Sequence, residues 1–421
     1  MSQLVPKVEF FTGQAKLIAD REQTVDVLIR ITPPQPESAA MQRPKLNLSM
    51  VLDRSGSMKG QKMERAREAT AFCIDQLLPT DRVSVVIFDD EIEVLIPSQQ
   101  AEDAAELKER LSRVSARNST ALHQAWVNGG IQVSEHTIEE GINRVLLITD
   151  GLANIGLTNT DEIVTQASEL FKRGVSTSTI GIGDDFNEDL LLPMAQAGGG
   201  NGWHVETSED MQRIFAVELQ GLIAQVAHTV TLGLIPADGV RLVDLLNDFE
   251  MTDTGRYQLP NLQTGRSLDV VVQLRVPAQV AGAKIRLLDL RLGFTSQQAK
   301  SADVIKHPFE VEFDTETRVQ RLPLNHDVAK AVRLLMNARA RREAMSHMDD
   351  GDYGQALFSI QSAAKATHDA CAPFGDNPEV QAEYAALADL QSSLTDRKQD
   401  KMSRKKLAYA ADARRKGNEP K

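Results

Sequence analysis

Hydrophobic and polar residues follow three different patterns along the 421-residue chain. In the first, short apolar runs alternate with amphipathic helical stretches. The apolar runs lie at 45–52, 82–88, 143–149 and 175–182, and the helical stretches at 59–78, 101–113, 120–134, 160–172, 187–197 and 208–224. Continuous apolar runs suit strands that are buried on both faces of a parallel sheet. The alternation therefore predicts an α/β doubly wound domain, with 91–96 as an antiparallel edge strand.

A period-2 pattern flanks this segment on both sides. Apolar side chains occupy every second position within 25–31, 268–276, 288–292 and 309–313, which is typical of half-buried antiparallel strands. A proline-rich linker, 32–44, follows the first of them. We expect residues 225–322 to form an antiparallel β-sandwich. Residues 1–43 are expected to supply N-terminal strands that pair with it, so that the Rossmann-like domain at 44–224 is an insertion.

The third pattern is helical and covers residues 323–421. Val328, Val332 and Leu335 follow helical spacing, and the acidic turn at 349–352 is expected to cap the next helix. From Arg397 to Lys421 there are ten Lys or Arg and three Asp or Glu, a net charge of +7. We interpret the final 20 residues as a frayed basic tail. Contact with an acidic partner or a membrane surface is the alternative.

Composition narrows the classes of function. The net charge of −12 argues against a general nucleic-acid binder, which usually carries a basic domain. The two cysteines, Cys73 and Cys371, lie too far apart for a disulfide framework, and Cys73 is expected to be a small buried hydrophobe. The chain has no run of 18 apolar residues and no signal peptide pattern. We therefore expect a cytoplasmic protein without a membrane span.

Oxygen-bearing side chains gather at the ends of the predicted parallel strands, where open α/β sheets bind their ligands. The five candidates are Asp53, Ser55, Ser57, Thr120 and Asp150. Hard cations prefer oxygen ligands, so the set predicts Mg²⁺, with Ca²⁺ or Mn²⁺ as alternatives. Zinc is disfavoured because no Cys or His accompanies the set. Since only two members are charged, a carboxylate of a partner could complete the coordination.

The same residues resemble the von Willebrand factor A domain family. Asp53-Arg54-Ser55-Gly56-Ser57 matches its DxSxS motif, Ser119-Thr120-Ala121-Leu122 its threonine loop, and Asp150-Gly151 its terminal aspartate. The resemblance covers residues 45–224. It implies a metal ion-dependent adhesion site formed by Asp53, Ser55, Ser57, Thr120 and Asp150. The whole chain resembles bacterial proteins in which such a domain is set in a β-sandwich and, more loosely, inter-alpha-trypsin inhibitor heavy chains.

Each motif also has a structural interpretation. Asp53, Ser55 and Ser57 could cap a helix, although their register with Thr120 and Asp150 favours the metal site. Gly181-Ile182-Gly183 lacks the third glycine of a dinucleotide fingerprint and is expected to be a turn. The glycine run 198–202 follows a helix, whereas a phosphate cradle precedes one. We therefore interpret it as a loop at a helix C-terminus.

These observations predict a metal-dependent protein-binding module without catalytic activity of its own. Its partner would be a protein that offers an Asp or Glu to the metal. One alternative, suggested by the resemblance, is a substrate-loading or accessory subunit of a MoxR-type AAA+ ATPase. A second alternative is a metal-dependent hydrolase, for which more carboxylates or a distinct base would be expected. A third is a scaffold in which the metal only stabilises the fold.

Overall fold

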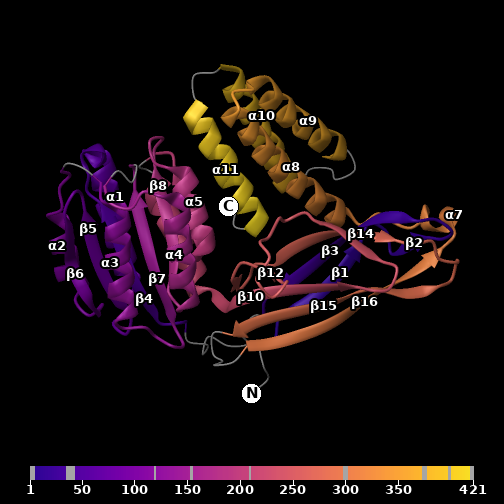
Figure 1. The fold of residues 1–421 in the computed structure, drawn as a ribbon, viewed down its shortest axis with the longest axis horizontal. Helices are drawn as coiled ribbons and strands as arrows, with labels where there is room; N and C mark the ends of the chain where they lie inside the picture. The colour runs from indigo at the N-terminus through magenta and orange to yellow at the C-terminus, as the bar shows by residue number, and fades with distance from the viewer. Residues whose placement is uncertain are drawn as a thin grey trace. The chain divides into compact units, whose positions relative to one another are not determined.

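The computed structural model describes residues 5–34, 43–117, 120–151, 155–207, 210–296, 302–371, 377–396 and 400–417. The backbone forms two compact units (Figure 1). One unit spans Ala40–Ala224, and the other combines Met1–Ala39 with Gln225–Glu419. Each unit has a hydrophobic core of its own. Among the described helices, none combines the length and the apolarity that crossing a membrane requires.

The unit at 40–224 contains a six-stranded sheet in the order β6-β5-β4-β7-β8-β9. Its strands are β4 (Leu46–Asp53), β5 (Arg82–Phe88), β6 (Ile92–Gln100), β7 (Ile142–Thr149), β8 (Ser176–Ile182) and β9 (Gly199–Val205). Neighbouring strands run parallel, except that β6 is antiparallel to β5 at the edge. The sheet confirms the predicted Rossmann-like α/β class and the antiparallel edge strand.

Helices cover both faces of this sheet. They are α1 (Gln61–Asp75), α2 (Ala104–Ser112), α3 (Leu122–Ser134), α4 (Thr160–Lys172), α5 (Glu188–Ala197) and α6 (Asp210–Ile223), with the short 3-10 helix η1 (Gly56–Met58) before α1. Met50 and Leu52 of β4 share one core with α1 and α6, which includes the buried Cys73. Val51 points the opposite way. A Cβ on Gly129 of α3 would lie 2.4 Å from Val51 Cγ2, so α3 packs closely against the other face.

The interpretation of 198–202 as a loop is wrong, because β9 begins at Gly199 and pairs with β8. A Cβ on Gly200 would lie 2.1 Å from the carbonyl oxygen of Thr177, and one on Gly199 would lie 2.3 Å from the ring of Phe171. Glycines are therefore needed for the strand to come this close to β8 and α4. The turn predicted at Gly181-Ile182-Gly183 is confirmed only at Gly183, where the chain bends, because Gly181 and Ile182 are the last residues of β8.

The other unit contains two further sheets, in the orders β1-β3-β14-β11 and β12-β10-β15-β16-β2. The strands are β1 (Lys7–Thr12), β2 (Lys16–Ile18), β3 (Gln23–Thr32), β10 (Gln225–Pro236), β11 (Arg241–Leu245), β12 (Tyr257–Gln258), β13 (Leu262–Gln263), β14 (Leu268–Val276), β15 (Lys284–Ser296) and β16 (Ala302–Asp314). β3 pairs with both β1 and β14, and β13 pairs with β10. Alternate side chains of both sheets form one core. Most of the linker expected at 32–44 lies outside the described residues.

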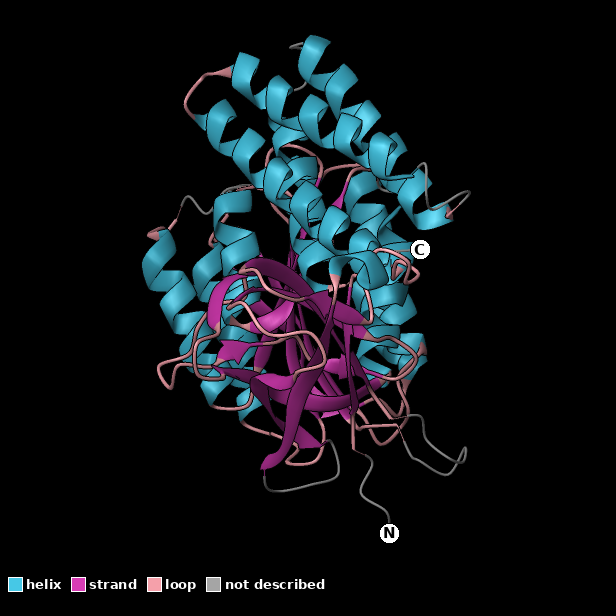
Figure 2. Ribbon diagram, turned by 90° about the vertical axis from the view of Figure 1, so that its right-hand side faces the viewer, coloured by secondary structure: helices cyan, strands magenta, loops and turns pink. Residues whose placement is uncertain are grey.

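Helices form the last part of this unit. They are α7 (Glu316–Val319), α8 (His326–Asp349), α9 (Tyr353–Cys371), α10 (Pro378–Asp396) and α11 (Asp400–Lys416). Figure 2 shows the four long helices running side by side, whereas the short α7 lies against β2. As predicted, the acidic turn caps α9: the backbone N–H of Gln355 donates to Asp352 Oδ1 at 3.0 Å. The prediction of a frayed basic tail is wrong over α11. This helix buries Leu407, Ala408 and Ala411, an apolar stripe that the surrounding Lys and Arg obscure in the sequence.

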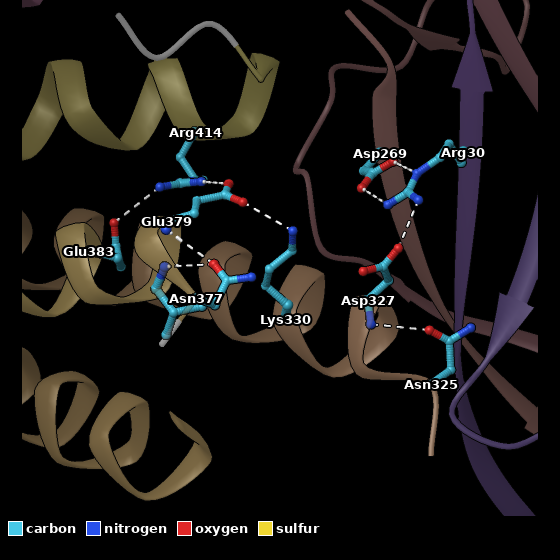
Figure 3. A network of polar contacts seen from close by, with 10 residues as sticks. Arg30, Asp269, Asn325, Asp327, Lys330, Asn377, Glu379, Glu383 and Arg414 are labelled. Atoms are coloured by element: carbon cyan, nitrogen blue, oxygen red, sulfur yellow. Dashed lines mark hydrogen bonds and ion pairs between the residues drawn. The ribbon is translucent and has the colours of Figure 1, made fainter. Parts of the chain in front are cut away.

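Helix α8 lies on the outer face of the sheet that contains β3 and β14. Val328, Ala331 and Leu335 of α8 pack against Leu28 and Val271 of these strands. Figure 3 shows polar contacts that α8 makes with this sheet and with the neighbouring helices. Arg30 joins Asp269 on β14 to Asp327 on α8, with N–O distances of 2.8 Å. Glu379 joins Lys330 of α8 to Arg414 of α11 at 3.0 and 2.8 Å. Apolar and charged contacts thus hold α8 against this sheet, and Glu379 connects α8 to α11.

Candidate metal centre

Two carboxylates meet at the carboxyl edge of the six-stranded sheet. Asp53 is the last residue of β4, and Asp150 directly follows β7, its neighbour. Both side chains are inaccessible to solvent. Asp53 Oδ1 accepts a hydrogen bond from the backbone N–H of Ser55 at 2.7 Å, and Oδ2 accepts one from Thr149 Oγ1 at 2.5 Å. These two bonds fix the orientation of the Asp53 carboxylate at the strand end.

The two serines of the motif connect the carboxylates. Ser57 Oγ donates to Asp150 Oδ1 at 2.7 Å, and Ser55 Oγ lies 3.1 Å from Ser57 Oγ. The capping interpretation is wrong. The side chain of Ser55 makes no capping bond to η1, and α1 has Gly60 at its N-cap position. The serine hydroxyls therefore point to the edge of the sheet and are not used to start the helix.

Thr120 reaches the same place from a different loop. The backbone N–H of Ala121 donates to the carbonyl oxygen of Asp89 at 2.7 Å, which holds the loop against the end of β5. A Cβ built on Gly151 would lie 3.4 Å from Thr120 Oγ1 and 3.7 Å from Asp53 Oδ2. The Thr120 hydroxyl and the Asp53 carboxylate thus converge above Gly151. Residues 118–119 and 152–154 lie outside the described residues.

A buried ion pair connects the loop that follows β4 with the loop that carries Thr120. Arg54, the variable residue of the motif, lies 3.2 Å from Asp89 (Nε to Oδ2) and 3.0 Å from Glu93 (Nη1 to Oε2). Its carbonyl oxygen accepts a bond from the backbone N–H of Arg117 at 2.6 Å. Because Asp89 also receives the N–H of Ala121, Arg54 links the loop after β4 to the loop that carries the threonine. Arg54 occupies a position of the DxSxS motif at which any residue is allowed, but in this chain its side chain helps to hold two loops of the site together.

The charges of the two carboxylates are balanced unequally. Burial raises the pKa of Asp53 to about 6, the negative charge of Asp150 adds to this rise, and the bonds from Thr149 and Ser55 oppose it. No Lys, Arg or His among the described residues forms an ion pair with Asp53. Asp150, in contrast, contacts a cation: Lys62 Nζ lies 2.6 Å from its Oδ2. A buried carboxylate without a counter-ion is costly unless a cation or a proton joins it.

Sequence reasoning found the five candidate ligands but missed two residues that contact them. Thr149 is the last residue of β7, and Lys62 lies in the first turn of α1. The signal for Thr149 was a hydroxyl directly before the terminal aspartate. The signal for Lys62 was a cation a few residues after the motif, on the helix that must start at the same sheet edge. Lys62 also lines an open cleft of about 480 Å³, together with Lys59, Gln61, Ile182, Gly183, Glu206 and Thr207.

The donor set fits a hard divalent cation. All five candidates offer oxygen, the donor that Mg²⁺ and Ca²⁺ prefer. Two of them supply negative charge and three supply neutral hydroxyls. Thr120 Oγ1 and Asp53 Oδ2 both face the side of Gly151 on which a Cβ would stand, so no side chain at this position lies between them. These residues can therefore hold a cation, which would bring to the buried Asp53 the positive charge that its surroundings lack.

Comparison with known proteins agrees with this architecture. Residues 47–217 match the von Willebrand factor type A domain family. A von Willebrand factor type A structure from Catenulispora acidiphila has a TM-score of 0.70 at 19% identity and covers 98% of both chains. The ArnB paralog from Sulfolobus acidocaldarius has a TM-score of 0.64 at 16% identity and covers 99% of both chains. At these identities the similarity extends to the fold of the whole chain and no further.

Two curated proteins show how far the sequence similarity reaches. An uncharacterized protein of Synechocystis sp. is 26% identical over 349 residues, which covers 76% of this chain and 78% of that protein. Human inter-alpha-trypsin inhibitor heavy chain H4 is 27% identical over 230 residues, which covers 50% of this chain but 24% of the heavy chain. The chain therefore spans about a quarter of the length of this second relative.

Proposed function

We propose that this chain, in which residues 47–217 form a von Willebrand factor type A domain, binds a divalent metal ion and uses it to bind another protein. The metal ligands would be Asp53, Ser55, Ser57, Thr120 and Asp150, some of them acting through water. Mg²⁺ is the preferred ion because the donors are all oxygens and only two are charged. Ca²⁺ and Mn²⁺ share this preference for oxygen.

One observation carries the proposal: Asp53 is fully buried at an edge rich in hydroxyls, and no cationic side chain among the described residues pairs with it. A buried structural carboxylate usually has a charged partner. Burial here raises the pKa of Asp53 to about 6, so at neutral pH the carboxylate is ionised at a cost in stability. A bound cation would offset that cost, which explains why the chain retains a carboxylate at this position.

The chain's own residues define what the bound metal could do. When bound, the metal supplies a positive centre for an acidic side chain of a partner. The hydroxyls of Ser55, Ser57 and Thr120 contribute donors without neutralising that charge. The carboxylates belong to rigid strand ends, and the ion pair of Arg54 with Asp89 supports the loop before Thr120. This arrangement favours binding over catalysis, since Asp53 and Asp150 are both held by hydrogen bonds. The accessory role beside an AAA+ ATPase stays a prediction from resemblance.

The test is affinity capture with the full chain from native lysate, in Mg²⁺ and in EDTA. Wild type is compared with Asp53→Ala and with Glu91→Gln, a control that changes an exposed carboxylate near the site. We expect a protein that is retained by wild type and by the control in Mg²⁺, and lost in EDTA or with Asp53→Ala. A partner retained equally in every lane would show that binding does not use the metal, and would contradict the proposal.

A further inference from the structure

Lys62 is the cation that lies against the candidate metal ligands. It occupies the first turn of α1, and its Nζ lies 2.6 Å from Asp150 Oδ2. The Asp150 side chain is fully buried, whereas that of Lys62 is 32% exposed. The other oxygen of Asp150 accepts the hydroxyl of Ser57. Both oxygens of this carboxylate are therefore occupied by donors of the chain itself.

We infer that Lys62 is a tethered counter-ion of the metal site, which neutralises Asp150 while no metal is bound and leaves it when a divalent cation binds. The inference rests on the proposed metal site. Lys62 thereby competes with the metal, so that the affinity for the metal is lower than the five ligands alone would give. It also keeps the metal-free site intact, because Asp150 never remains buried without a positive charge.

Electrostatics supports a competition of this kind. A divalent cation held by Asp53 and Asp150 would face the ammonium of Lys62 across a single carboxylate. Like charges a few ångströms apart in a poorly solvated site repel by several kcal/mol even at an effective dielectric constant of about 20. Two cations cannot both be satisfied by Asp150, whose Oδ1 is already bonded to Ser57. The ammonium is the one that can move, since its stem is flexible and partly solvated.

The Lys62 side chain has space into which it can move when it leaves Asp150. Lys62 lines the cleft of about 480 Å³ described above, which opens beside the sheet edge. Its Nζ lies 3.6 Å from the position that a Cβ of Gly183 would occupy, so the missing side chain there leaves the path to the cleft clear. Lys59 lines the same cleft. The displaced ammonium would thus join a second cation close to the metal, where both favour an anionic group of the partner.

Lys59 also provides the matched control, because it lines the cleft but makes no ion pair with Asp53 or Asp150 among the described residues. The experiment measures Mn²⁺ binding to the full chain by titration calorimetry at pH 7.5. The variants are Lys62→Met, Lys62→Arg, Lys59→Met and Asp53→Asn. Thermal unfolding without metal shows that each variant is folded before its affinity is compared.

We expect Lys62→Met to bind Mn²⁺ at least tenfold more tightly than wild type, and Lys59→Met to stay within about twofold of it. Lys62→Arg keeps the charge and should bind no more tightly than wild type. Without metal, Lys62→Met should unfold at a lower temperature than Lys59→Met, because Asp150 loses its counter-ion.

Equal or weaker Mn²⁺ binding by Lys62→Met would overturn the inference while leaving the metal site in place. If Lys62→Arg bound as tightly as Lys62→Met, the effect would not be one of charge, and the inference would also fall. A different result would show that the proposed function itself is wrong: no binding by wild type or Lys62→Met, or binding that persists in Asp53→Asn. The two failures are therefore distinguishable in one set of titrations.

Discussion

The two ends of the six-stranded sheet each bury acidic side chains, and they treat them differently. Near the amino ends of β7 and β8, Glu218 of α6 lies 2.8 Å from Arg144, with both side chains almost inaccessible. At the carboxyl end, roughly 20 Å further along β7 at 3.3 Å per residue, Lys62 pairs with Asp150, and no cation among the described residues pairs with Asp53. At the amino end, the buried acid and base neutralise each other. At the carboxyl end, two buried carboxylates lie near a single lysine.

Glu218 illustrates full compensation. It accepts hydrogen bonds from Ser178 Oγ at 2.6 Å, and from Asn201 Nδ2 and Trp203 Nε1 at 2.8 Å each. Burial alone raises the pKa of this carboxyl, but the charge of Arg144 and the hydrogen bonds outweigh that effect, so the pKa lies below its ordinary value. The group is ionised and satisfied within the fold. It joins α6 to β7, β8 and β9.

Asp53 illustrates incomplete compensation. It also accepts two hydrogen bonds, but burial dominates and its pKa rises to about 6. The difference between the two ends is a positive charge that the chain supplies to Glu218 and not to Asp53. Where a natural protein leaves a buried polar group poorly compensated, the position is often a functional site. The charged pair at the amino end therefore stabilises the fold, whereas the unbalanced charge at the carboxyl end supports the metal binding that we propose.

The largest effect on stability should come from breaking the buried ion pair between Arg144 and Glu218. Arg144→Met removes the cation from a fully buried pair and leaves Glu218 without one, which should lower the free energy of unfolding by about 3–5 kcal/mol. Denaturant unfolding at pH 7 measures the change. Arg113→Ala, which breaks an exposed pair with Glu109 on α2, should cost less than about 0.5 kcal/mol. Similar losses for the two variants would remove the basis of the comparison.

At the other end, neutralising a carboxylate should stabilise the protein. Asp53→Asn keeps the shape and the acceptor for the N–H of Ser55 but removes the buried charge. A pKa of about 6 against an ordinary value of 3.8 corresponds to roughly 2–3 kcal/mol. Metal-free Asp53→Asn should therefore unfold at higher denaturant concentration than wild type at pH 7.5. Lower stability than wild type would mean that the Asp53 charge is already balanced.

The sign of the pH dependence follows from the raised pKa. The folded protein holds the Asp53 proton more tightly than the unfolded chain does, so this group favours folding at low pH and loses that contribution as pH rises through about 6. The advantage of Asp53→Asn over wild type should shrink below pH 6 and vanish near pH 4. Parallel unfolding curves from pH 4 to 8 measure it. An advantage that is constant across this range would point to packing instead of charge.

Metal binding should show the reverse dependence on pH. A carboxyl must lose its proton before it can bind a metal. The affinity for Mn²⁺ should therefore be nearly constant above pH 6.5 and fall about tenfold per pH unit below the pKa of about 6. Calorimetric titrations of wild type at several pH values check this. An affinity unchanged between pH 7 and pH 5 would show that Asp53 is not a ligand.

A smaller effect is expected from the hydroxyl that orients Asp53. Thr149→Val keeps the shape of the buried side chain and removes the donor to Asp53 Oδ2, which lies at 2.5 Å. The loss of one such bond is worth roughly 1 kcal/mol, so Mn²⁺ affinity should fall by about fivefold. Thr165→Val, which removes a hydroxyl from exposed α4, is the control and should leave the affinity unchanged. A loss in both variants would show that the effect is not local to the site.

The spacing of hydrophobic residues was enough to predict most of the helices and strands. Buried runs such as 143–149 marked the parallel strands, and Asp53 and Asp150 were found because strand ends meet at one edge. What was missed depends on contacts between distant residues. Arg144 and Glu218 are 74 positions apart in sequence, and nothing local announces their pairing. Strand β9 was missed because its glycines serve close approach to β8 instead of a turn.

Local composition also concealed the contact of Lys62 with Asp150 and the buried side of α11, which was interpreted as a frayed tail. Lys62 resembles an ordinary exposed lysine in the sequence, and its contact with Asp150 depends on how α1 begins after the motif. In α11 the Lys and Arg residues dominate the composition, while Leu407 and Ala411 are buried among the neighbouring helices. In both cases the number of charged residues did not predict which side chains are buried or paired. Their positions on the helix did.

The proposed metal site is tested most directly by a crystal structure of the full chain with Mn²⁺, in which anomalous scattering locates the metal. We expect one strong peak at the carboxyl edge of the sheet, within about 2.0–2.6 Å of the Ser55 and Ser57 hydroxyls, and no such peak in Asp53→Asn. The Lys62 ammonium should have left Asp150 in the same crystal. No peak at this edge, or a peak that persists in Asp53→Asn, would contradict the claim that these residues bind a metal.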